Sequence, residues 1–202
     1  MSEDARSELV PLDVDAGLWD RVYRVAPLVL IGTREGEAYD LAPKHLALPL
    51  SWEDHYGFVC SPRHATYHNV KRTGEFTVSY PRPSQVVLAS LAAAPREGWE
   101  SDKPVVRDLP TMPGTRVDAP LLVDAYFQLE CELDRIVDDF GPNSLIAGRV
   151  VAAHATRRAL IVSDRDPDEQ LARSPLLAYV DPGRFARIES ARAFPFPAGF
   201  KK

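Results

Sequence analysis

Residues that can bind an anion are grouped within six positions of the chain: Ser61, Arg63, His64 and Thr66. They follow the apolar run 56–60, which has the length of a strand, and precede a helix-like stretch that reaches Gly74. Free backbone N–H groups and the dipole at a helix start attract negative charge, and an arginine can donate two parallel hydrogen bonds to a phosphate. The pattern predicts a phosphate-binding cup. A plainer interpretation stays open, with Ser61 capping the helix and Arg63 as a solvated charge.

Other chemical signatures are weak or missing. His64 and His68 lie four positions apart with Glu75 downstream, a spacing that could bring two imidazoles to one metal ion. The glutamate of a zinc hydrolase motif is missing between them, so we predict no metal site. The glycine motifs of dinucleotide-binding and P-loop folds and the G-x-S-x-G motif are also missing, and no catalytic side chain can be assigned. Cys60 and Cys131 lie in strand-like patterns and are predicted to be buried free thiols.

Segments of strand length dominate the chain. Apolar runs and alternating patterns predict strands at 27–33, 56–60, 75–80, 126–133, 145–151, 159–163 and 176–180. In 126–133 the alternation is strict, so Glu130 is expected on the face opposite Leu129 and Cys131. Helices are predicted at 16–24, at 84–94 before Pro95, and after the anion-binding residues. A mainly β fold follows, a β-barrel with a few helices.

Composition limits the kind of protein. The 202 residues are 45% hydrophobic and carry a net charge of -5, with no block of consecutive basic residues, which excludes the electrostatic pattern of a nucleic-acid binder. No apolar run approaches the length of about 20 residues that spans a membrane, and none follows the first charged residues as in a secretory signal. We therefore expect a soluble, cytoplasmic protein with one domain over 1–202, a core at about 18–185 and a tail at 186–202.

A succession of short motifs resembles the flavin reductase-like family. The chain reads Asp40-Leu41-Ala42-Pro43, then the strand 56–60, the loop 61–66, the helix and Thr73-Gly74-Glu75-Phe76, in the order and spacing typical of members. The segments 119–131, 148–151 and 175–179 resemble the central barrel strand, the strand after it and the closing segment. The resemblance implies an FMN-binding split β-barrel of Greek-key type, in the flavoredoxin-like branch.

The resemblance also implies a non-covalent FMN site. The residues it points to are Asp40, Leu41, Ala42, Pro43, Lys44, His45, Ser61, Arg63, His64 and Thr66. Lys44 would stabilise the negative charge of reduced flavin, unless it is a plain surface lysine. Trp52 and Tyr56 would flank the flavin ring, with core packing as the alternative. Glu130 would lie near the flavin or a dimer interface, with a water-facing position as the alternative.

Two departures from the family pattern bear on activity. Asp40 replaces the usual asparagine, and Asn143 replaces a histidine that the family associates with nicotinamide binding. Three hypotheses follow: an NAD(P)H-dependent flavin reductase, a flavoredoxin-type electron carrier serving a redox partner protein, and a non-flavin binding protein on the same barrel. The family habit of building flavin sites at subunit interfaces, together with the apolar tail 193–200, predicts a homodimer.

Overall fold

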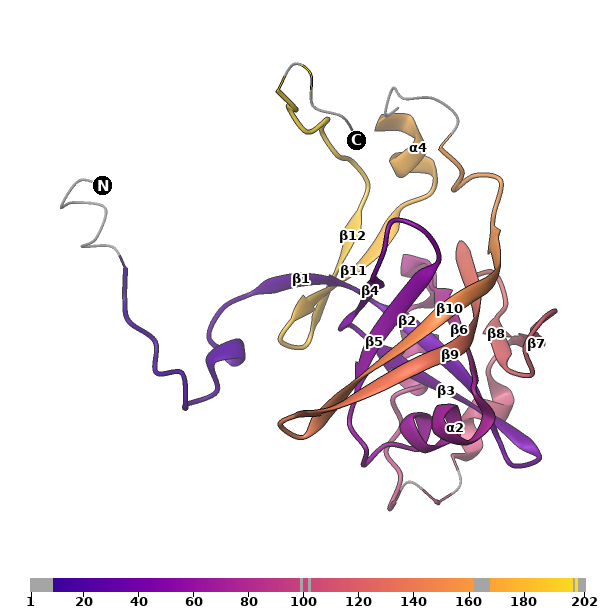
Figure 1. Cartoon of the computed structure of the whole chain (residues 1–202). Helices are drawn as coiled ribbons and strands as arrows, with labels where there is room; N and C mark the ends of the chain where they lie inside the picture. Colours follow the sequence, from indigo (N-terminus) through magenta and orange to yellow (C-terminus); the bar gives the residue numbers. More distant parts are fainter. Residues whose placement is uncertain (1–8, 99, 102, 162–167, 198, 200–202) are drawn as a thin grey trace.

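A seven-stranded antiparallel sheet forms the body of the molecule in a computed structural model, which describes residues 9–98, 100–101, 103–161, 168–197 and 199 (Figure 1). Neighbouring strands of this sheet follow the order β3 (Ala38–Lys44), β2 (Val29–Glu35), β6 (Glu75–Tyr80), β9 (Phe127–Phe140), β10 (Asn143–Ala155), β5 (His55–Cys60) and β4 (Ala47–Pro49). Strands distant in sequence therefore lie side by side. The mainly β prediction is confirmed.

The sheet curls until its two ends are joined by one stretch of chain. β3 pairs with β2 as far as Lys44, and after only two intervening residues Ala47 of β4 pairs with Phe58 of β5. The carbonyl of Leu46 accepts a 2.8 Å hydrogen bond from the amide of Val59 at this crossing. The same stretch thus closes the barrel at one end. The outer edge of β3 has no strand partner among the described residues, and this opening is the split of the barrel.

Two apolar clusters hold the barrel. The inner cluster fills the barrel with side chains that include Ile31, Phe58, Phe76 and Ile146. The outer cluster packs Leu30 of β2 against α3 (Val86–Leu91) and η3 (Pro104–Asp108). β2 is buried on both faces, which explains why its sequence is a continuous apolar run rather than an alternating one. Both cysteines are buried and free, as predicted.

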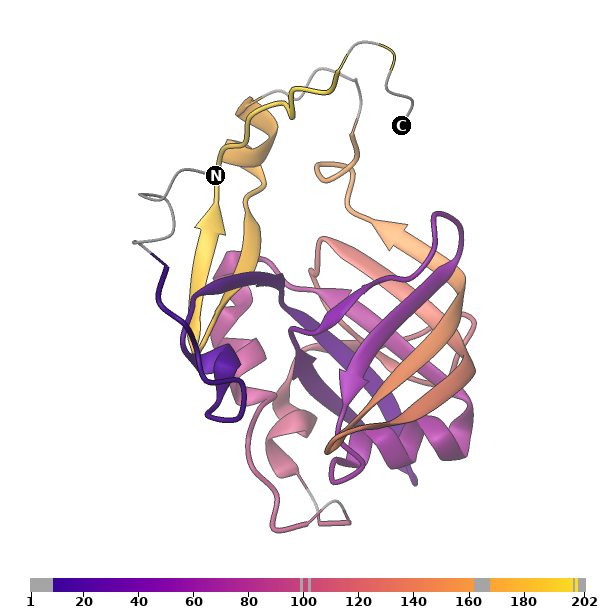
Figure 2. The same cartoon turned by 60° about the vertical axis from the view of Figure 1, so that its left-hand side comes forward.

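Shorter elements surround the barrel. α2 (Ala65–Thr73) joins β5 to β6, η2 (Pro83–Gln85) precedes α3, and a small ribbon consists of β7 (Thr111–Pro113) and β8 (Pro120–Leu122). A separate three-stranded sheet contains β1 (Arg24–Pro27), β11 (Leu176–Asp181) and β12 (Arg184–Ile188). The helix α4 (Asp168–Arg173) directly precedes β11 in the chain. This small sheet lies beside the barrel (Figure 2), and the described chain before β1 extends away from the barrel (Figure 1). No helix among the described residues is long and apolar enough to cross a membrane.

Most predicted strands are confirmed, and several are longer than predicted. β9 and β10 run to 14 and 13 residues and form one long hairpin. The helix predicted at 16–24 is wrong: only the single turn η1 (Leu18–Asp20) forms, because Gly17 has φ 68° and β1 begins at Arg24. The helix predicted at 84–94 is shorter and ends at Leu91.

One predicted strand is wrong over its described part. Residues 159–161 form a turn and irregular backbone, and the side chains of Leu160 and Ile161 are exposed. The rest of that prediction, 162–163, lies outside the described residues. An apolar run this short carries no period that separates a strand from an exposed loop.

Candidate functional site

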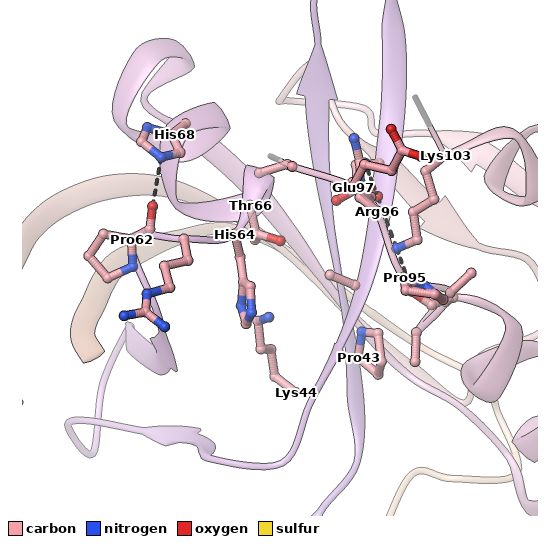
Figure 3. A pocket seen from close by; sticks show the side chains of 18 residues that line it. Pro43, Lys44, Pro62, His64, Thr66, His68, Pro95, Arg96, Glu97 and Lys103 are labelled. Carbon is pink, nitrogen blue, oxygen red and sulfur yellow. Dashed lines mark hydrogen bonds and ion pairs between the residues drawn. The ribbon is translucent and has the colours of Figure 1, made fainter. Parts of the chain in front are cut away.

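A pocket of about 820 Å³ opens where the barrel is split (Figure 3). One wall is β3, the second is the start of α2, and the third is the 92–98 segment, defined as residues 92–98 after α3, together with Lys103. We call this cavity the split pocket. It is formed by parts of the chain that lie far apart in sequence, and its position follows from the unpaired edge of β3.

Seven of the ten predicted site residues line the split pocket: Asp40, Ala42, Pro43, Lys44, Arg63, His64 and Thr66. The other three do not. Leu41 is fully buried in the outer apolar cluster. The His45 ring stacks on Tyr179 with 4.6 Å between ring centroids. The Ser61 hydroxyl oxygen accepts a hydrogen bond from the Arg63 amide at 3.3 Å, so its contact is with the turn before α2.

The start of α2 leaves its donors available to a ligand. His64 is the N-cap and makes no side-chain hydrogen bond to the helix, so the interpretation of Ser61 as the cap is wrong. The first turn of α2 holds no acidic residue. The Arg63 guanidinium forms no hydrogen bond or ion pair with any other described residue. This end of the split pocket can therefore accept an anion without displacing a contact between described residues.

In the split pocket the neutral imidazole of His64 lies near the cations of Lys44 and Lys103. Burial lowers the pKa of His64, and the nearby charges of Lys44 and Lys103 lower it further. The His64 Nδ1 lies 4.0 Å from the Cys60 sulfur. Burial raises the pKa of the Cys60 thiol, so this cysteine is an unreactive neighbour rather than a nucleophile. His64 is expected to be neutral at neutral pH.

A buried ionic cluster ties β3 to the third wall. The Asp40 carboxylate lies 2.9 Å from the Arg96 guanidinium and 3.3 Å from the Lys103 ammonium, and Arg96 also pairs with Glu35 at 2.8 Å. Burial lowers the pKa of Lys103, which also donates a 2.8 Å hydrogen bond to the Leu41 carbonyl. Asp40 therefore holds the pocket together and does not offer a free charge to a ligand.

Sequence reasoning missed Arg96 and Lys103. Both occur between Pro81 and Pro120, where clustered prolines predict loops or ordered coil and no local pattern identifies a contact partner. One signal was available, because a carboxylate next to the apolar residues Leu41 and Ala42 needs a buried cation as partner.

The aromatic and acidic residues named from the sequence lie elsewhere. Tyr56 is 2% exposed inside the barrel, where its hydroxyl meets the Tyr80 hydroxyl at 2.8 Å, so the core alternative is confirmed. Trp52 is fully exposed and does not line the split pocket. Glu130 is on the non-core face of β9 as predicted, but the water-facing alternative is wrong, since it is fully buried under the loop that includes Thr115.

Glu130 is satisfied by that loop. Its carboxylate accepts hydrogen bonds from the backbone amides of Thr115, Arg116 and Val117 at 2.8, 2.6 and 3.1 Å. His154 lies 3.4 Å away on β10. The carboxylate therefore anchors the turn between β7 and β8.

The histidine pair of α2 has another use than a metal site. His68 Nε2 donates a 2.7 Å hydrogen bond to the carbonyl of Pro62. The described residues contain no group of three or more His, Cys, Asp or Glu side chains arranged to hold a metal ion.

The chain matches the family model described as a flavin reductase-like domain over residues 23–176. It belongs to that family, and the fold is an FMN-binding split barrel. Among solved structures it resembles an FMN-binding protein from Thermus thermophilus with bound p-hydroxybenzaldehyde, at 25% identity and a TM-score of 0.72, covering 93% of this chain and 97% of that one.

Two further structures support the same fold. A flavoredoxin from Methanosarcina acetivorans matches at 16% identity and a TM-score of 0.76, covering 95% of this chain and 97% of that one. Component B of nitrilotriacetate monooxygenase from Bacillus cereus matches at 17% identity and a TM-score of 0.77, covering 93% and 98%.

Proposed function

We propose that this chain is an FMN-binding oxidoreductase that holds FMN non-covalently in the split pocket and passes electrons through it. The observation that carries the proposal is the meeting of Arg63, the start of α2 and the free edge of β3 at one pocket. Membership of the flavin reductase-like family supports it. When bound, FMN supplies the hydride and electron chemistry, so the protein needs to bind and orient it and needs no acid–base residue.

The start of α2 fits the phosphate of FMN. Arg63 can donate two parallel hydrogen bonds to a phosphate, and the amides of Ala65 and Thr66 stand at the positive end of the helix dipole. The neutral His64 ring adds a hydrogen-bonding group without a charge. The absence of an acidic residue in the described first turn removes the repulsion that a dianion would otherwise meet.

The free edge of β3 fits the polar side of the flavin ring. Lys103 reaches the Leu41 carbonyl from this edge, so the peptide groups of Leu41 and, two residues on, Pro43 point away from β2. The Pro43 carbonyl on this edge can accept a hydrogen bond from the N–H of the flavin ring, whereas the Leu41 carbonyl is already used by Lys103. Lys44, which also lines the split pocket, would favour the negative charge that reduction adds to a bound flavin.

We further propose NAD(P)H as the electron donor, with electron transfer to free flavin or another acceptor. The second candidate is a flavoredoxin-type carrier that exchanges electrons with a partner protein and reacts slowly with NAD(P)H. Asn143 favours this second candidate, because it replaces the family's nicotinamide-associated histidine and does not line the split pocket. Anaerobic stopped-flow mixing with NADH and with NADPH distinguishes the reductase from the carrier. A carrier should show slow bleaching of the flavin with both donors, and a reductase should show fast bleaching with at least one.

The flavin site is tested by replacing Arg63. FMN and riboflavin are titrated by fluorescence quenching into wild-type apoprotein and Arg63→Ala. Charge-assisted hydrogen bonds contribute about 1.5–3 kcal/mol each, so FMN should bind about 10- to 100-fold more weakly to the variant. Riboflavin has no phosphate and its affinity should stay unchanged. Equal losses for both ligands would contradict the phosphate role, and a colourless wild-type protein that binds neither would favour the non-flavin alternative.

We also propose a homodimer. Exposed apolar side chains on the small sheet and the segments beside it support this: Tyr23, Val25, Phe185 and Phe194 are 66, 73, 57 and 70% exposed. Apolar surface of this kind is costly in water and is typical of interfaces. Light scattering at micromolar concentration should report twice the 22.4 kDa chain mass, and a monomer would contradict the proposal.

A further inference from the structure

We propose a second ligand site, for a small phosphate-bearing molecule, in a pocket at the other end of α3. This pocket has a volume of about 640 Å³ and shares no lining residue with the split pocket. Its walls come from η2 and the start of α3, from the chain before β9, and from the turn after β10. Three arginines line it: Arg82, Arg157 and Arg158. We call it the arginine pocket.

Arg82 is held in position before any ligand arrives. Its Nε donates a 2.9 Å hydrogen bond to the Asp124 carbonyl, and its Nη2 lies 3.3 Å from the Thr156 hydroxyl. These contacts use part of the guanidinium and leave its remaining N–H groups for an acceptor. A fixed arginine loses little side-chain entropy on binding, which favours recognition of a planar or tetrahedral anion.

No contact with the described part of the chain explains Arg157 and Arg158. Both side chains are exposed in the turn after β10, and neither guanidinium forms a hydrogen bond or ion pair with a described residue. Together with Arg82 they gather three positive charges in a chain of net charge -5. These like charges repel one another, and a bound anion would offset the repulsion because it attracts each guanidinium.

The shape and the other lining residues indicate a small molecule with an organic part. The site is a hollow rather than a flat surface, and Leu88, Pro110 and Val123 give it an apolar wall. The guanidinium groups match a phosphate, which accepts parallel hydrogen bonds from arginine. A phosphate ester with a ring or chain, such as a nucleotide, would use both features. Among the described residues that line the pocket, Asp124 alone is acidic, and its carboxylate opposes such a ligand.

The test uses the full chain with a stoichiometric amount of FMN, which fills the split pocket without an excess of free FMN to compete for the arginine pocket, and is repeated on Arg63→Ala. ADP, inorganic phosphate and adenosine are titrated by calorimetry. ADP should bind and adenosine should not, and inorganic phosphate as tight as ADP would identify the free ion as the ligand. The double variant Arg157→Ala/Arg158→Ala should weaken ADP binding about 10- to 100-fold. These arginines are exposed, so the fold should tolerate the change.

Two further variants make the test specific. Asp124→Asn should tighten ADP binding about two- to fivefold, because it removes the opposing charge. Asparagine also accepts the φ of 61° found at this position. Arg135→Ala is the matched control, since Arg135 is exposed and outside both pockets, and it should leave binding unchanged.

Three results would overturn the proposal. They are no binding of ADP or phosphate at millimolar concentration, equal binding by the double variant, and loss of binding only in Arg63→Ala. The last result would place the anion in the split pocket. ADP binding is measured separately in wild-type protein and in Arg63→Ala. The arginine pocket can therefore be tested even if the proposed FMN site proves wrong.

Discussion

Replacement of Asp40 by asparagine is expected to destabilise the fold and to loosen the third wall of the split pocket. Asp40 is 2% exposed, and its carboxylate is shared by Arg96 and Lys103 at 2.9 and 3.3 Å. Asparagine keeps the shape of the side chain and removes its charge. Breaking a buried ion pair by removal of one partner costs about 3–5 kcal/mol. Arg96 keeps Glu35 at 2.8 Å, so we expect the lower limit, about 3 kcal/mol.

Urea unfolding at pH 7 measures this free energy, and limited trypsin digestion reports exposure of the chain after Arg96. Asp40→Asn/Lys103→Met should be more stable than the single variant by about 1–2 kcal/mol, because one of the two buried cations is removed with its carboxylate. Glu37→Gln is the control on the same hairpin, with a side chain that is 100% exposed. A loss below about 0.5 kcal/mol in Asp40→Asn, with unchanged digestion, would refute the role given to the cluster.

Two more predictions concern the barrel itself. Gly32→Ala should lower the free energy of unfolding by about 2 kcal/mol, because the added methyl group overlaps the Pro120 carbonyl and the Thr77 hydroxyl; thermal unfolding unchanged from wild type would show that β8 can move away. Burial alone would raise the pKa of Glu130, but hydrogen bonds from the Arg116 and Thr115 amides outweigh it and hold the pKa below its usual value. Ionised Glu130 therefore stabilises the fold at pH values above its usual pKa, and this stability is lost as the pH falls through the lowered pKa. Glu130→Gln should lower the free energy of unfolding by about 1.5–3 kcal/mol at pH 7 and flatten the acid side of the curve of that free energy against pH. A curve for the variant that runs parallel to the wild-type curve would contradict this reasoning.

The strands were predictable because burial acts on a regular period. β5 and β6 were predicted to within one residue at each end, since their apolar runs end where the chain turns at Ser61 and at Pro81. α2 was predictable from Pro62 before it and Gly74 after it, and Gly74 indeed ends the helix with φ 74°.

Elements outside the barrel were not predictable in the same way. The spacing of Leu18, Trp19, Val22 and Tyr23 is typical of an amphipathic helix, yet Trp19 and Tyr23 are 62 and 66% exposed, so no core surface is there to stabilise one. A helical pattern forms a helix only where its apolar face is covered.

Half of the split pocket could be predicted, and the other half depends on tertiary contacts. β3 and the start of α2 carry recognisable local patterns. Arg96 and Lys103 reach the pocket only because the chain after α3 folds back onto β3, and nothing local in the sequence indicates that return. The sequence made Asp40 conspicuous as a departure, and only the structure shows that Arg96 and Lys103 are its partners.

The free edge of β3 has a consequence for self-association. An unpaired strand edge recruits other extended chains, which add to it through main-chain hydrogen bonds and seed aggregates. On this edge Pro43 offers no N–H, and the Leu41 carbonyl already accepts a hydrogen bond from Lys103. An incoming strand would therefore lack main-chain hydrogen bonds at two positions of this edge, Leu41 and Pro43. The barrel can keep its split open to a compact ligand while the same opening is a poor template for aggregation.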